Sequence, residues 1–238
     1  MKQLISFLKF IISLLFGESA YFKMRWFLLY GRSYYAIAGY WAIDGWLTEK
    51  EARALYDTVC NLSAKEPVVV EIGSWLGKSS VILGKGLKKK KAGKLFCIDP
   101  FDASGDKIGE EDYHRRAERL GIPLVEKFIR NLKKCGVFEY VEILQGKSWE
   151  FSGEWNKEVD FLFIDGDHSY EAVLRDYLDW GKFVKKGGFI GFHDVAMNPE
   201  EKSVYQDGPW RVVKDKIIDN KDWADKVFFH SLFIAKKV

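Results

Sequence analysis

Acidic and imidazole side chains stand at the ends of two apolar stretches of this sequence. One stretch, residues 159–165, ends at Asp165, and the other, residues 187–192, is followed by His193 and Asp194. If the two stretches are neighbouring strands, Asp165, His193 and Asp194 could form a site for a divalent cation. An imidazole prefers softer transition ions, whereas an oxygen-rich set suits Mg²⁺ or Mn²⁺. Two arrangements therefore stay open: His193 binds the ion, or the two aspartates bind it with water while His193 stands behind them.

A glycine-rich turn follows another apolar stretch. The segment 68–80, VVVEIGSWLGKSS, places Glu71 after three valines and puts Gly73 and Gly77 ahead of a helical pattern that begins at Lys78. A run of valines suits a strand buried on both faces, and glycines let the backbone approach a ligand closely. The segment therefore predicts the strand, turn and helix of a Rossmann-type cofactor site.

The same segment has a second interpretation as a phosphate-binding loop, because Gly77, Lys78 and Ser79 look like the end of a Walker A motif. That motif needs four residues between its first glycine and the Gly-Lys pair, whereas only residues 74–76 stand here. The length of such a loop aims successive N–H groups at the phosphates, and the carboxylate of Glu71 would repel a polyphosphate. A nucleotide-dependent kinase or ATPase is therefore the alternative hypothesis.

The elements that must position these groups are five apolar stretches separated by helical patterns. They cover residues 68–70, 94–99, 140–144, 159–165 and 187–192, and polar residues stand at or just after their ends. This alternation is typical of a parallel sheet whose carboxyl edge holds the site. Asp99, at the end of the second stretch, stands where doubly wound folds bind a ribose diol.

Four motifs make the chain resemble a known family: EIGSWLGKSS, IDPFD, FIDGDHSYEAVLRDYLDW and KKGGFIGFHDV. From residue 45 to the C-terminus it resembles class I S-adenosylmethionine-dependent methyltransferases, in particular the small O-methyltransferases that act on sugars and natural products. The resemblance implies an α/β, Rossmann-like doubly wound sheet of seven strands, mainly parallel with an antiparallel last strand. Its final two strands would form a hairpin within residues 226–235. The implied reaction moves the methyl group of S-adenosylmethionine (SAM) to a hydroxyl of a small molecule or sugar.

The same resemblance implies cofactor residues in this chain. Asp99 would take the ribose hydroxyls, and Ser148 would contact the adenine edge with Trp149 beside it. Asp165 would lie near the methionine amino group and, in the metal-dependent members, bind the metal as well. The methionine part of SAM would meet the first strand end and its turn, which offer Glu71, Gly73, Ser74, Trp75, Gly77 and Ser79.

His168 is the candidate general base. It falls where the related catechol and caffeoyl-type enzymes carry a catalytic lysine, and an imidazole titrates near working pH. Asp167 could be the base instead or could orient His168, and the structural alternative is that His168 caps the helix that begins near Tyr170. On that helix a three-and-four spacing predicts a buried stripe of Tyr170, Val173, Leu174, Tyr177 and Leu178.

Composition predicts one soluble catalytic domain and gives no sign of nucleic-acid binding. The 238 residues include 37 basic and 34 acidic side chains, a net charge of +3. A lysine cluster between residues 85 and 94 has no interleaved aromatic residue that could stack on bases. Three cysteines in no recognisable pattern predict a reducing, cytoplasmic location without a structural disulfide.

Residues 1–46 are a predicted N-terminal extension of the methyltransferase domain, which is assigned to residues 47–238. Residues 4–16 are mostly apolar but only about half the roughly 20 residues that a membrane span needs. A helix there would dock on a second subunit, as in a homodimer, or on its own core. Peripheral contact of residues 1–16 with the inner face of a membrane is the second interpretation. Aromatic residues crowd the segment 21–46, which predicts either a cover over the substrate or ordinary packing.

Three further segments flank the predicted site. Thr48 with Glu51 forms a capping box, which predicts a helix that runs to about Leu62. The polar segments 101–121 and 196–210 follow strand ends, so we expect loops there that cover the acceptor pocket and set its specificity.

The acceptor is the most open part of the prediction. A sugar hydroxyl, for example on a surface polysaccharide or glycolipid precursor, is a hypothesis that rests on the resemblance and on the possible interfacial helix. A protein that binds the cofactor without catalysis is a further alternative. Such a protein would keep Glu71, Gly73 and Asp99 but would tolerate loss of His168 and Asp194.

Overall fold

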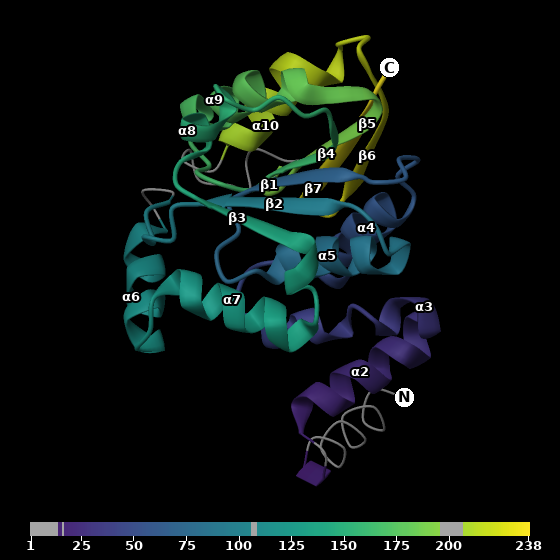
Figure 1. Cartoon of the computed structure of the whole chain (residues 1–238), viewed down its shortest axis with the longest axis vertical. Helices are drawn as coiled ribbons and strands as arrows, with labels where there is room; N and C mark the ends of the chain where they lie inside the picture. Colours follow the sequence, from purple (N-terminus) through teal and green to yellow (C-terminus); the bar gives the residue numbers. More distant parts are fainter. Residues whose placement is uncertain (1–13, 16, 106–108, 196–206) are drawn as a thin grey trace.

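The computed structural model describes residues 14–15, 17–105, 109–195 and 207–238. Its centre is a single sheet made of β1 (Val68–Ile72), β2 (Lys94–Asp99), β3 (Val141–Gln145), β4 (Val159–Ile164), β5 (Val184–Phe192), β6 (Trp223–Phe229) and β7 (Leu232–Lys237). The strand order is β3-β2-β1-β4-β5-β7-β6 (Figure 1). Strands β1 to β5 pair in parallel, and β7 runs antiparallel to both β5 and β6. The predicted seven-stranded sheet with an antiparallel last strand is confirmed.

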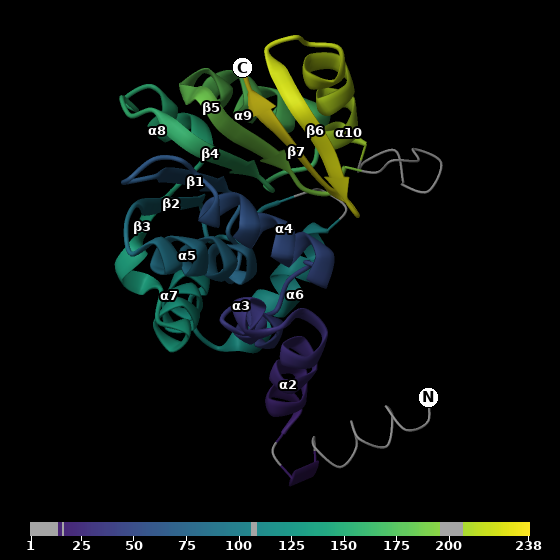
Figure 2. The same cartoon turned by 90° about the vertical axis from the view of Figure 1, so that its right-hand side faces the viewer.

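Helices cover both faces of the sheet (Figures 1 and 2). One layer holds α4 (Glu49–Cys60), α5 (Lys78–Lys90) and α7 (Leu124–Cys135), and the other holds α8 (Ser148–Ser152), α9 (Tyr170–Trp180) and α10 (Gly208–Val213). Successive side chains of a strand point to opposite faces, so each central strand feeds two cores. Phe161 and Phe163 of β4 pack in the first core, and Leu162 and Ile164 pack in the second.

The strand register brings four carboxyl ends to one edge. Ile72 at the end of β1 pairs with Ile98 of β2 and with Ile164 of β4, and Ile164 pairs with Phe192 of β5. The residues that follow these four positions therefore emerge side by side, as parallel strands require.

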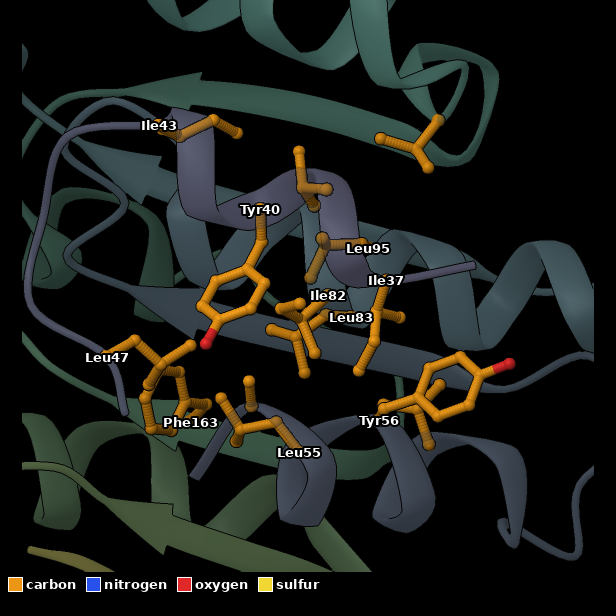
Figure 3. Packing of buried hydrophobic residues seen from close by; sticks show 14 of the residues in the cluster. Ile37, Tyr40, Ile43, Leu47, Leu55, Tyr56, Ile82, Leu83, Leu95 and Phe163 are labelled. Atoms are coloured by element: carbon orange, nitrogen blue, oxygen red, sulfur yellow. The ribbon is translucent and has the colours of Figure 1, made fainter. Parts of the chain in front are cut away.

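The N-terminal segment adds α2 (Glu18–Tyr30), α3 (Arg32–Tyr35) and the 3₁₀ turn η1 (Ala38–Ala42). Its second half is part of the first core, where Ile37, Tyr40 and Ile43 pack among Leu55 of α4 and Ile82 of α5 (Figure 3). Phe22, Trp26 and Tyr40 thus serve ordinary packing, while Trp46 lines the cavity described below. The assigned domain boundary at residue 46 stays a prediction.

The remaining elements are α6 (Glu110–Leu120), η2 (Phe138–Tyr140), η3 (Gly181–Phe183) and η6 (Lys214–Ile218). The expected loop over residues 101–121 is therefore wrong for its second half, which is α6. Residues 196–206 of the second expected loop lie outside the described residues, and Gly208 begins α10. Tyr140 ends a 3₁₀ turn, so the third strand begins one residue later than predicted.

The capping box is confirmed, since Thr48 and Glu51 exchange both of its hydrogen bonds and α4 ends at Cys60. The predicted stripe on α9 needs correction, because Leu178 is 56% exposed. Val173, Asp176 and Trp180 are the residues that this helix buries. The predicted helix over residues 4–16 falls outside the described residues except for Leu14 and Leu15. Within the described ranges, no helix has both the length and the apolar character needed to cross a membrane.

Candidate functional site

A cavity of about 500 Å³ lies at the carboxyl edge of the sheet. It joins the turn after β1, the ends of β2 and β3, and the residues that follow β4 and β5. Of the residues predicted from sequence, it is lined by Gly73, Ser74, Trp75, Ser79, Asp99, Ser148, Asp165, Asp167, His168, His193 and Asp194. The sheet thus brings together most residues that the sequence singled out.

The turn after β1 depends on Gly73 and is held by Asp99. Gly73 has φ +86°, and a Cβ there would overlap the backbone of Asp165, so only glycine lets β1 and β4 end side by side. Asp99 Oδ2 accepts the backbone N–H groups of Ser74 and Trp75, both at 2.8 Å, and its Oδ1 accepts that of Phe101 at 2.7 Å. Burial raises the pKa of Asp99, while the three N–H donors lower it in part.

Glu71 does not reach the cavity, which corrects the prediction that it meets the cofactor. It is fully buried beneath the turn, where its Oε2 accepts the hydroxyl of Ser74 at 2.8 Å and that of Ser80. Cys97 Sγ of β2 lies 3.3 Å from the same oxygen. Burial raises the pKa of Glu71, and the surrounding hydroxyls counter that effect. Glu71 therefore supports the turn from below.

Gly77 and Lys78 also differ from their predicted roles. Gly77 has φ +88°, and a Cβ there would stand 3.0 Å from the ring of Phe128, so this glycine serves the packing of α5 against α7. Lys78 lines the cavity, but its ammonium donates to the carbonyl of Gly45 at 2.8 Å. Burial lowers the pKa of Lys78. The lysine that a phosphate-binding loop requires is thus engaged with the N-terminal segment.

An acid–imidazole cluster follows β4 and β5. His168 Nε2 lies 3.7 Å from Asp165 Oδ1 and 3.6 Å from Asp194 Oδ2. One potential ligand atom from each of these three residues lies within 4.8 Å of the others, which is the arrangement expected of a cation site. Ser169, rather than His168, caps α9, because its hydroxyl accepts the N–H of Ala172 at 3.4 Å. The helix-cap interpretation of His168 is therefore wrong.

His193 lies behind this cluster, so the structure favours the second predicted arrangement. Its Nδ1 is 3.1 Å from Asp165 Oδ1 and 3.4 Å from Asp194 Oδ2, and its Nε2 faces Glu51 at 3.6 Å. Burial alone would lower the pKa of His193, but the two aspartates raise it well above its usual value. Both ring nitrogens of His193 thus face carboxylates, and the group of possible ligands contains His168 in place of His193.

Glu51 is a site residue that the sequence identified only as part of a helix cap. It is buried, and its Oε1 accepts the N–H of Ser231 at 3.0 Å and the hydroxyl at 2.7 Å. His230 Nδ1 lies 3.1 Å from the same oxygen. Burial would raise the pKa of Glu51, but His193 and the hydrogen bonds hold it well below its usual range. Glu51 joins α4, the β6–β7 turn and the back of the acid–imidazole cluster.

Asp176 is a second residue that the sequence analysis missed. It is buried on α9, it lines the cavity, and its Oδ1 accepts the hydroxyl of Ser148. Burial is the main cause that raises its pKa to about 7. The signal was present in the sequence, because a charged residue three positions after Val173 falls on the buried side of that helix.

Aromatic side chains close the cavity on the side of the N-terminal segment. The ring of Tyr113 on α6 lies 5.3 Å from that of Trp46 and 5.0 Å from that of Trp75, both edge to face. The guanidinium of Arg116 lies 4.8 Å above Trp46 and bonds Asp44 at 2.9 Å. These contacts fix α6 against the segment before α4, and they place three rings at the cavity.

Comparison with known proteins identifies the domain that contains these strand ends. A family model described as a methyltransferase domain matches residues 70–195. The chain is 28% identical over 159 residues to protein R132 of Acanthamoeba polyphaga mimivirus, an alignment that covers 66% of this chain and 60% of that relative. The chain thus spans about three fifths of that relative's length.

Solved structures share the fold at low sequence identity. The O-methyltransferase TomG from Streptomyces achromogenes, solved with SAM, matches with a TM-score of 0.62 and 15% identity, covering 91% of this chain and 95% of TomG. An O-methyltransferase from Bacillus cereus, solved with S-adenosylhomocysteine (SAH), matches with a TM-score of 0.61 and 14% identity, covering 90% and 96%.

Proposed function

We propose, since this chain belongs to the methyltransferase-domain family, that it transfers the methyl group of SAM to a hydroxyl of a small molecule or sugar. The cavity carries the proposal, because the glycine turn after β1 and the acid–imidazole cluster after β4 and β5 open into one space. A methyl donor and an acceptor oxygen must meet in line, and positioning supplies much of the rate in such a transfer.

The residues at the first three strand ends suit the parts of SAM. Asp99 accepts three backbone N–H groups, and a carboxylate has about four acceptor positions, so one remains for a ribose hydroxyl. The oxygen atoms of Ser148 and Asp176 would together accept hydrogen bonds from the amino group of adenine. Asp165 would lie near the methionine amino group. Ser74, Trp75 and Ser79 complete this half of the cavity.

The donor set of Asp165, His168 and Asp194 fits a divalent cation. Two carboxylates with one imidazole favour Mn²⁺ or another transition ion over Mg²⁺, which prefers oxygen ligands alone. When bound, such an ion would lower the pKa of an acceptor hydroxyl and orient it toward the methyl group. In this proposal His168 is a cation ligand instead of the general base that the sequence predicted.

Asp167 is then the group placed to receive the proton. Its side chain is exposed, it lines the cavity beside His168, and its Oδ1 accepts the N–H of Ser169 at 2.8 Å, which fixes the carboxylate. The acceptor oxygen forms a bond to the methyl carbon as its proton passes to Asp167. The bond from that carbon to sulfur breaks, and its electron pair leaves the sulfur neutral, so the products are SAH and a methyl ether.

An acceptor screen tests the proposal. Full-length protein is incubated with SAM and a panel of sugar and phenolic hydroxyl compounds, with Mn²⁺, with Mg²⁺ or with a chelator, and SAH release is measured. We expect release that depends on the acceptor and the ion, and that is lost in Asp165→Asn. Asp179→Asn, at a partly exposed ion pair with Arg175 on α9, is the matched control.

Three results would contradict parts of the proposal. Methylation of free phenols or catechols alone would overturn the sugar hypothesis. SAM binding without turnover of any acceptor would favour the non-catalytic alternative. ATP binding without SAM binding would favour the kinase or ATPase alternative, which the engagement of Lys78 with Gly45 argues against.

A further inference from the structure

Helix α2 buries one face and leaves apolar side chains on the other. Phe22 and Trp26 are buried against Tyr40, with the rings of Trp26 and Tyr40 5.5 Å apart. The outer face of α2 consists of Met24, Phe27, Leu28 and Leu29, with Leu28 72% exposed and Leu29 57% exposed. An exposed cluster of large apolar residues marks an interaction site more often than a single exposed residue does.

This outer face lies far from the sheet. In both views α2 projects from the two helical layers, beyond α3, at the end of the molecule opposite α9 and α10 (Figures 1 and 2). Leu14 and Leu15, which precede the start of α2 by four and three residues, are also exposed, at 72% for Leu14 and 66% for Leu15.

Basic side chains outnumber acidic ones in this part of the sequence, and three of them, Lys23, Arg25 and Arg32, lie in the described residues. Residues 1–43 contain five basic side chains, Lys2, Lys9, Lys23, Arg25 and Arg32, and a single acidic one, Glu18. The whole chain has a net charge of only +3, so the remaining residues are slightly acidic. Arg25 is paired with Glu49, whereas Arg32 is exposed at the start of α3, two residues after α2 ends. Apolar residues together with an excess of basic ones are the two features that bind a peripheral protein to an anionic bilayer.

We infer that the outer face of α2 docks on an anionic membrane surface, with the helix lying in the plane of the interface. The 13 residues of α2 span about 20 Å, short of the roughly 30 Å of a bilayer core, so the helix would lie on the membrane. A second copy of the chain is a less suitable partner. An interface between two identical outer faces would bring the basic side chains of both subunits together.

The inference is independent of the reaction at the cavity. The predicted docking of residues 4–16 on a second subunit or on their own core falls almost entirely outside the described residues and stays a prediction. The predicted location at the inner face of a membrane follows from the inference as part of the same proposal.

Vesicle sedimentation tests the inference. Full-length protein is mixed with vesicles of phosphatidylcholine alone or of phosphatidylcholine with phosphatidylglycerol, at low and at high salt. We expect binding that requires phosphatidylglycerol and weakens with salt. Leu28→Asp should lower the binding about tenfold or more, since it removes an inserted side chain and adds a negative charge. Leu178→Asp, at a 56% exposed leucine on α9, is the matched control and should bind as the parent does.

Each remaining outcome overturns the inference. Equal binding of the Leu28→Asp and parent proteins would move the contact away from α2. Absence of vesicle binding, with a dimer in light scattering that Leu28→Asp dissociates, would identify a second copy as the partner. If the parent protein neither bound vesicles nor formed a dimer, the outer face of α2 would serve neither membrane docking nor subunit contact. Circular dichroism of both variants verifies that they are folded.

Discussion

The carboxyl edge of the sheet and helix α2 depart from ordinary burial in opposite directions. At the edge, Glu51, His168, Asp176 and His193 are charged or titratable and yet less than 9% exposed. On α2, leucines stand more than half exposed. Burying charge and exposing leucine both cost free energy, so each region has a feature that stability alone does not explain. The buried polar groups of the sheet edge are suited to binding a polar ligand, and the exposed leucines of α2 are suited to contact with an apolar surface.

The two regions also differ in how they are held. Glu51 and Asp99 make several hydrogen bonds to elements distant in the sequence, whereas α2 contacts mainly α3 and η1. Substitutions at the edge should therefore disturb stability and ligand binding together. Substitutions on the outer face of α2 should change neither stability nor ligand binding at the cavity.

Glu51→Ala should have the largest effect. It removes the acceptor of Thr48 and Ser231 and leaves His193 without its facing carboxylate, and such losses from a buried pair cost about 3–5 kcal/mol. Urea unfolding followed by circular dichroism measures the change. Glu171→Ala, at an exposed residue of α9, is the control. If Glu51→Ala lowered the free energy of unfolding by less than about 1 kcal/mol, Glu51 would not have the joining role described above.

Asp176→Asn should alter the pH dependence of stability. The pKa of Asp176 is raised from 3.8 to about 7, so between these values the folded protein binds a proton that the unfolded chain has lost. The free energy of unfolding of the parent protein therefore falls as pH rises through this window, by about 2–4 kcal/mol in total above pH 7. The asparagine side chain of the variant does not titrate, so this pH-dependent loss should be absent from the variant. Unfolding curves from pH 4 to pH 8 measure it, and parallel curves for both proteins would contradict the assignment.

Asp194→Asn should weaken Mn²⁺ binding by about 100-fold, because it removes one of two charged ligands from the proposed set. His193→Asn should weaken it less, by about tenfold, since His193 orients Asp165 from behind. Calorimetric titration of the metal-stripped proteins separates the two. If His193→Asn weakened Mn²⁺ binding more than Asp194→Asn did, His193 would be a ligand of the ion.

Leu28→Ala should have the smallest effect on stability, within about 0.5 kcal/mol, because the residue is mostly exposed. Thermal unfolding checks this value. A loss of 2 kcal/mol or more would mean that the outer face of α2 packs against the chain itself, which would remove the basis for membrane docking.

Sequence patterns predicted the sheet because each strand is a local feature. The five β-branched or aromatic stretches that precede polar residues became β1 to β5, and their parallel order placed the polar ends together. Asp165 and Asp194 were therefore found without knowledge of any contact between them.

The roles of individual residues were harder to predict, because they depend on which way a side chain points after a strand ends. Glu71 lies within β1 and points beneath the turn, while Gly77 meets Phe128 of a helix about 50 residues later. For the same reason, His168 rather than His193 groups with Asp165 and Asp194, and His193 lies behind them. The contact of Glu51 with Ser231 joins residues 180 positions apart, and no local pattern reports it.

Calorimetric titration of the 238-residue chain with SAM and, separately, with ATP distinguishes a SAM-dependent methyltransferase from a nucleotide-dependent kinase or ATPase. We expect saturable binding of one SAM per chain, weakened in Asp99→Ala, and no binding of ATP. Binding of ATP that is lost in Lys78→Ala, with no binding of SAM, would contradict this expectation.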